Sequence, residues 1–144
     1  MPVAALVTWI ITALIGSFML LRWVSRGGLR RGGGAATHFP PARVFTHFGL
    51  AAVGLVLWIG YLVTDSSVVA WIAFAALVPV ALLGGLLVRR WAKDGRAAMR
   101  GDTRPDGVEL AEQHIPRAPV VLDGIFAIST FVLVLLSALG VGEG

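Results

Sequence analysis

Four long apolar stretches dominate this 144-residue sequence and limit what it can fold into. They cover residues 3–21, 44–64, 68–88 and 118–141. A helix needs about 20 apolar residues to cross the hydrocarbon core of a bilayer. Only 14% of the residues are charged and the mean hydropathy is +0.84, whereas soluble domains carry about 25% charged residues. We therefore expect one all-α integral membrane domain over residues 1–144. Since no basic region precedes the first stretch, we expect it to be retained as a span rather than cleaved.

Basic residues occur in only two segments between these stretches. All 12 Lys and Arg residues lie in residues 22–43 or 89–117. Cytoplasmic loops of membrane proteins are enriched in Lys and Arg, so we expect both segments in the cytoplasm and both termini outside. This predicts a multi-pass protein of the plasma membrane. The same rule explains the net charge of +4 without a nucleic-acid partner. We expect residues 89–117 to form a polar loop, with a short surface helix around residues 108–113.

The sequence contains a weak internal repeat. At a shift of 76 residues, the matching pairs include His38 with His114, Pro40 with Pro116, and Ala51 with Ala127. At a shift of 68 residues, Gly16 matches Gly84. Two membrane passes separate the copies, so both have the same orientation and are related by an axis along the membrane normal. We therefore expect a four-helix bundle that consists of two parallel-repeat helical hairpins.

In the repeat, His47 of the second span aligns with Asp123 of the fourth span. Ionisable residues inside spans are expensive to bury and commonly functional. Both lie on stripes of small and polar residues, which membrane helices use for close approach. We expect the two side chains to meet directly or through one water. This intramembrane polar pair could relay a proton or hold a cation or polar head group. Alternatively, it is a structural contact between two helices.

The three histidines are candidate metal or haem ligands, because imidazole suits zinc and iron. His38, His47 and His114 are all expected near the cytoplasmic side. In outline, the chain resembles the di-haem membrane cytochromes, whose histidines face each other in pairs. In this chain the residue aligned with His47 is Asp123 instead of a second histidine, which departs from that pattern. Since no compact ligand spacing is present, we expect the protein to have no cofactor. Haem b or a metal ion is the alternative. His38 and His114 could instead cap the proline-initiated helices that follow them.

Basic side chains beside the spans could bind anionic lipid head groups, each contributing about 1 kcal/mol. These residues are Arg22, Arg26, Arg30, Arg31, Arg89, Arg90 and Lys93.

The sequence contains no catalytic motif for nucleotide binding or for hydrolysis, and its lack of cysteine excludes thiolate chemistry. We therefore expect a non-catalytic binding or accessory protein. It would pack against a larger membrane complex, such as one of respiratory type, or against its own copy. The alternative is a small redox or transport protein that uses His47 and Asp123.

Residues 38–62, HFPPARVFTHFGLAAVGLVLWIGYL, together with the Arg, Gly and Ala-rich loops, carry a resemblance to other sequences. They resemble uncharacterised small four-span membrane proteins of high-GC actinobacteria. The resemblance implies a four-span fold and brings no activity with it.

Overall fold

The computed structural model describes residues 1–30, 37–102, 107 and 109–141. Each apolar stretch lies in one long helix, and a short 3₁₀ helix precedes the last one. These elements are α1 (Pro2–Ser25), α2 (Pro41–Thr64), α3 (Ser67–Met99), η1 (Ala111–His114) and α4 (Arg117–Ala138). All four α-helices are long and apolar enough to cross a membrane. The expected all-α membrane bundle is confirmed, and the chain is a multi-pass membrane protein.

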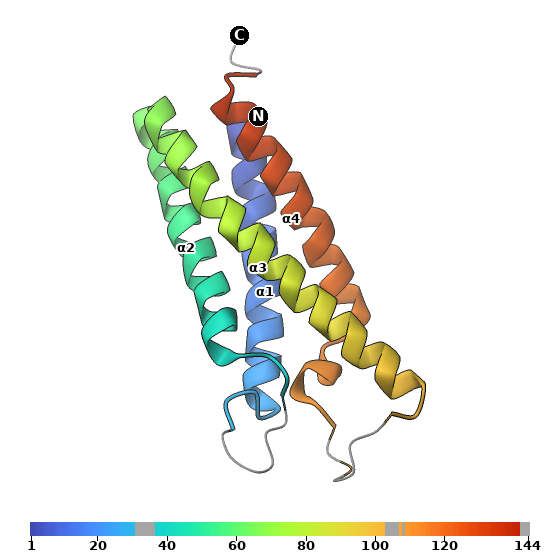
Figure 1. Ribbon diagram of the computed structural model, residues 1–144. Helices are drawn as coiled ribbons and strands as arrows, with labels where there is room; N and C mark the ends of the chain where they lie inside the picture. The colour runs from blue at the N-terminus through green and yellow to red at the C-terminus, as the bar shows by residue number, and fades with distance from the viewer. Residues whose placement is uncertain (31–36, 103–106, 108, 142–144) are drawn as a thin grey trace.

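The four helices form a bundle with two distinct ends (Figure 1). The start of α1 and the end of α4 lie at one end, which we call the terminal end. The other end holds η1 and the start of α2, and we call it the loop end. The main packing pairs are α2 with α3 and α1 with α4. Within the described residues, α2 and α4 are diagonal to each other, and their backbones do not approach closely.

Prolines and small polar residues set the helix boundaries. Pro41 occupies the first turn of α2, where its missing N–H leaves no hydrogen bond unmade. Asp65 ends α2 in the left-handed conformation (φ 52°), which Asp tolerates better than most residues. Ser66 follows as the N-cap residue of α3, without a side-chain capping bond, so the expected tight turn between these helices is present. Gly140 (φ 73°) ends α4 short of the predicted residue 141, while the Val141 N–H donates to the Leu136 carbonyl.

The prediction of a polar loop over residues 89–117 is wrong for the first third of that segment. Residues 89–99 continue α3, and we call them the α3 extension. The stretch is rich in alanine, and Arg90 and Asp94 form an i,i+4 ion pair at 3.5 Å, both of which favour helix. At 1.5 Å per residue, the extension adds about 16 Å to the helix. A short 3₁₀ helix, η1, lies near the expected surface helix, but Ala111 and Glu112 in it are fully buried, so it is not a surface helix.

Two clusters of buried side chains stabilise the bundle. The terminal-end core contains Trp9 and Trp58, and Trp9 packs so closely over Gly54 that an added Cβ there would lie 2.9 Å from the indole. The loop-end core contains Trp23 and Phe39. Large apolar side chains also cover the outside of the bundle, where they face acyl chains in a bilayer. Examples from each of the four α-helices are Leu14, Val56, Val63, Leu82 and Ile128.

Candidate functional site

The structure does not bring His47 and Asp123 into direct contact. Their helices, α2 and α4, lie on the diagonal of the bundle, so each side chain meets a neighbouring helix instead. His47 Nδ1–H donates to the Val80 carbonyl of α3 at 2.9 Å. A Cβ added to Gly84 would lie 3.0 Å from His47 Cε1. Asp123 faces α1, where a Cβ added to Gly16 would lie 4.0 Å from Asp123 Oδ1.

These two contacts occupy matching places in the aligned halves of the sequence. His47 aligns with Asp123, and Gly84 aligns with Gly16. In both places a glycine of the neighbouring helix leaves room for an ionisable side chain. The hydrogen bonding differs, because Asp123 Oδ1 is buried and accepts no hydrogen bond from any described residue. The direct pairing of His47 with Asp123 that the alignment suggested is therefore not present.

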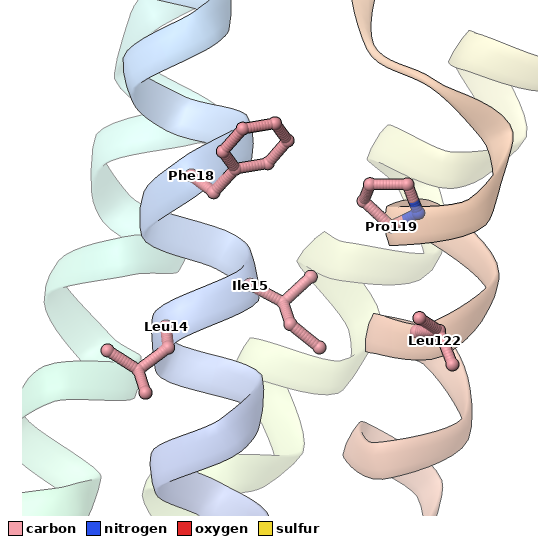
Figure 2. A pocket seen from close by; sticks show the side chains of 5 residues that line it. All are labelled: Leu14, Ile15, Phe18, Pro119 and Leu122. Carbon is pink, nitrogen blue, oxygen red and sulfur yellow. The ribbon is translucent and has the colours of Figure 1, made fainter.

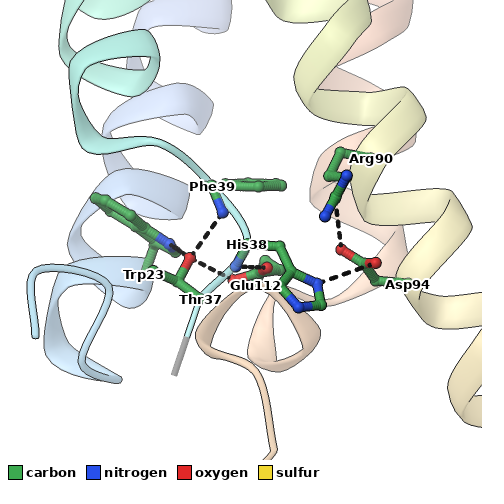
Figure 3. Close-up of polar contacts among 7 residues, drawn as sticks. All are labelled: Trp23, Thr37, His38, Phe39, Arg90, Asp94 and Glu112. Atoms are coloured by element: carbon green, nitrogen blue, oxygen red, sulfur yellow. Dashed lines mark hydrogen bonds and ion pairs between the residues drawn. The ribbon is translucent and has the colours of Figure 1, made fainter. Parts of the chain in front are cut away.

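A second group of polar residues lies at the loop end and centres on Glu112 of η1 (Figure 3). The Glu112 side chain is fully buried. Its Oε1 accepts the backbone N–H of His38 at 2.6 Å, and its Oε2 accepts the Thr37 hydroxyl at 2.7 Å. The Thr37 oxygen in turn accepts the indole N–H of Trp23 at 2.9 Å and the backbone N–H of Phe39 at 3.0 Å. These bonds connect α1, the segment before α2, and η1.

Asp94 of the α3 extension completes this group, which we call the loop-end cluster: Thr37, His38, Asp94 and Glu112. Asp94 Oδ1 lies 3.2 Å from His38 Nδ1, and Asp94 Oδ2 lies 3.5 Å from Arg90 Nε (Figure 3). Only 10% of the Asp94 side chain is exposed, yet its Oδ2 has no hydrogen-bond partner among the described residues. One ligand atom each from His38, Asp94 and Glu112 lies within 4.8 Å of the other two.

The candidate ligand set of three histidines is not assembled in the structure. His38 lies in the loop-end cluster, while His47 bonds to α3 within the bundle. His114 Nδ1 lies 3.1 Å from the Leu110 carbonyl, and its Nε2 lies 3.4 Å from Glu109 Oε2. The three imidazoles therefore have separate partners, because the fold places His38 beside carboxylates instead of other histidines.

The alternative prediction, that His38 and His114 cap the helices that follow them, is also wrong. Pro40 and Pro116 are the N-cap residues of α2 and α4, and neither helix has a side-chain capping bond. His38 and His114 instead connect neighbouring segments, and the His114 carbonyl accepts Arg22 Nε at 2.6 Å.

The basic residues proposed to bind lipid differ in their surroundings. Arg22 is half-buried and bonded to η1, whereas Arg90 is exposed and paired with Asp94. Arg31 lies outside the described residues. The remaining candidates are exposed, and they are Arg26, Arg30, Arg89 and Lys93.

A groove of about 280 Å³ lies between α1 and α4 on the outside of the bundle (Figure 2). It is lined by Leu14, Ile15, Phe18, Pro119 and Leu122. Since every lining side chain is apolar and several are exposed, the groove faces acyl chains when the helices span a bilayer.

The sequence did not indicate that Asp94, Glu112, Thr37 or Trp23 belong to a site. Their contacts join residues as far apart as 74 and 75 positions, as for His38 with Glu112 and Thr37 with Glu112. The one local signal was a carboxylate, Glu112, shortly before His114 and Pro116, at the edge of the fourth span.

Comparisons with protein-family models, with curated proteins and with solved structures found no match to this chain. The functional argument therefore rests on its own residues.

Proposed function

We propose that this chain is a non-catalytic accessory protein of a larger membrane complex, and that the loop end is its binding surface. The observation that carries the proposal is the fixed α3 extension. It projects beyond the apolar part of α3, and Asp94 connects it to His38 at the start of α2. Ordered surfaces lose less conformational entropy on binding than flexible loops do.

The chemistry of this surface favours an acidic partner. The α3 extension and its C-cap carry exposed basic side chains, namely Arg89, Lys93, Arg96 and Arg100. Charge complementarity directs association and suppresses wrong partners. A subunit with an acidic face, in a complex of respiratory type or another multi-subunit membrane assembly, would suit this surface.

The same charges support a proposal for the orientation of the bundle. We propose that the loop end faces the cytoplasm, that both termini face outward, and that the membrane is the plasma membrane. Anionic head groups would then surround Arg26 and Arg30. A reporter that is active only in the cytoplasm should be silent when it is fused after Gly144. Activity of that fusion would reverse the orientation.

Photo-crosslinking in native membranes tests the accessory role. A photoreactive residue replaces Lys93 on the α3 extension, and a matched probe replaces Leu86, an exposed residue in the apolar part of the same helix. We expect a discrete protein adduct from position 93 that position 86 does not give. Lipid adducts alone at both positions would contradict the proposal. An adduct between two copies of the chain would replace it with self-association.

A second function is supported by Asp123, whose buried Oδ1 lacks a hydrogen-bond partner among the described residues. Unpaired ionisable groups inside a span mark proton or ion pathways in many membrane proteins. A small redox or transport protein would use Asp123 and His47 separately, on the two sides of the bundle. The visible spectrum of the purified protein tests the haem form of this function. A Soret band would favour it over the accessory role.

A further inference from the structure

Three segments that are distant in sequence bring metal-ligand side chains together at the loop end. His38 precedes α2, Asp94 lies on the α3 extension, and Glu112 lies in η1. Their candidate ligand atoms all lie within 4.8 Å of one another. Figure 3 shows the imidazole of His38 between the two carboxylates.

The Glu112 carboxylate is held in place by its neighbours. The fully buried side chain accepts hydrogen bonds from the His38 N–H and from the Thr37 hydroxyl. Thr37 is itself oriented by the indole of Trp23. Carboxylate ligands of metal ions are typically fixed by such outer hydrogen bonds, which restrict their orientation. Each carboxylate oxygen has a second lone pair, so these bonds leave Glu112 free to coordinate a cation.

The charges of the cluster call for a cation. Two carboxylates lie close together, and the donors to Glu112 are neutral groups. Arg90 approaches only Asp94, at 3.5 Å, and its own side chain is 44% exposed. That contact is to Asp94 Oδ2, which makes no hydrogen bond with any described residue, whereas Oδ1 of the nine-tenths buried Asp94 faces His38. Buried carboxylates repel each other unless a proton or a metal ion lies between them.

We propose that His38, Asp94 and Glu112 bind one divalent transition-metal ion, with Zn²⁺ as the best match. Zinc bonds to nitrogen and oxygen of about 2.0–2.2 Å in a tetrahedron place two ligand atoms about 3.3–3.6 Å apart. The distance from His38 Nδ1 to Asp94 Oδ1 is 3.2 Å. One imidazole and two carboxylates favour zinc over the all-oxygen sites of Mg²⁺ and Ca²⁺. Three protein ligands leave the fourth position to water.

Metal binding would connect the α3 extension, the start of α2 and η1 through one ion. The His38 nitrogen that coordinates must be unprotonated, so a protonated His38 releases one proton to solvent on binding. The ion then takes the place of that proton between His38 and Asp94. The three segments would be held together more tightly with metal than without it.

Zinc titration of the full chain in detergent tests the proposal. The protein is purified without a histidine tag, stripped with a chelator and titrated with Zn²⁺ against a chromophoric competitor. We expect one Zn²⁺ per chain and a higher midpoint of thermal unfolding with zinc. His38→Gln and Asp94→Asn should each weaken binding at least about tenfold. Glu109→Gln removes an exposed loop-end carboxylate outside the cluster and should leave binding unchanged.

Thermal unfolding without metal shows whether each variant folds. His38→Gln should disturb packing less than Asp94→Asn, because the His38 side chain is 37% exposed and the Asp94 side chain only 10%. His114→Gln separates this ligand set from the set of three histidines, and we expect it to bind zinc as the unaltered chain does. The proposal is overturned if the unaltered chain binds no zinc, or if His38→Gln binds it equally well. An equal loss in Glu109→Gln or His114→Gln would also overturn it.

Discussion

Polar groups at the loop end and polar groups within the spans are accommodated in different ways. At the loop end, Glu112 accepts two hydrogen bonds, and Thr37 continues the network to Trp23 in α1. Within the spans, His47 makes a single bond to the Val80 carbonyl. Asp123 Oδ1 has no such partner among the described residues.

The difference shows what each environment allows. Connecting segments at the loop end can bring donors and acceptors from distant parts of the chain, so both oxygens of the buried Glu112 accept hydrogen bonds there. Backbone groups of a spanning helix are already bonded within the helix, so a polar side chain finds few partners on the neighbouring helix. In this protein the spans provide space instead, through Gly16 and Gly84. Hydrogen bonds and ion pairs should therefore contribute most to stability at the loop end, and close packing should contribute most to stability within the spans.

The largest effect is expected from Glu112→Ala. The substitution leaves the His38 N–H and the Thr37 hydroxyl without their acceptor in a partly buried place, which should cost about 3 kcal/mol. The free energy of unfolding, measured by chemical denaturation in detergent, checks this loss. Glu109→Ala is the matched control, because its side chain is 68% exposed. Equal effects of the two substitutions would mean that the loop-end network does not stabilise the bundle.

An intermediate effect is expected at the glycines of the spans. In Gly84→Ala the new methyl group meets the His47 ring, which its bond to Val80 holds in place, and the expected cost is about 1–2 kcal/mol. Gly16→Ala should be neutral or stabilising, because its Cβ has ordinary contact distance to Asp123 and alanine favours helix by about 1 kcal/mol. The same unfolding assay compares the two. The reverse order would show that His47 does not lie against α3.

The smallest effect is expected from Asp123→Asn. Since Asp123 Oδ1 has no hydrogen-bond partner among the described residues, the amide loses no bond there and removes a charge from the span. Unfolding free energy should stay within about 1 kcal/mol of the unaltered chain, or rise. A loss of unfolding free energy well above that would mean that the Asp123 carboxylate has a favourable partner in the unaltered protein, such as a bound cation.

Much of this fold could be predicted from the sequence, because its main determinants are local. Apolar runs define the spans, and Pro41 marks the start of α2. The α3 extension was missed because charged residues were read as loop, although Arg90 and Asp94 have helical spacing.

The polar sites were harder to predict for a different reason. A repeat relates His47 to Asp123 but does not say which helices are adjacent, and the fold puts α2 and α4 on a diagonal. The loop-end cluster depends on contacts between Thr37, His38, Asp94 and Glu112, which no local pattern connects. Partners within a helix or a turn can be read from spacing, whereas partners across the bundle require its geometry.

Cysteine crosslinking in membranes tests the arrangement of the helices most directly, and the chain has no cysteine of its own to interfere. Three double variants are compared with a short thiol-specific crosslinker: His47→Cys with Gly84→Cys, Gly16→Cys with Asp123→Cys, and His47→Cys with Asp123→Cys. The structure predicts intramolecular crosslinks in the first two and none in the third. Efficient crosslinking of the third variant, without the first two, would contradict the diagonal placement of α2 and α4 and restore the direct pairing of His47 with Asp123.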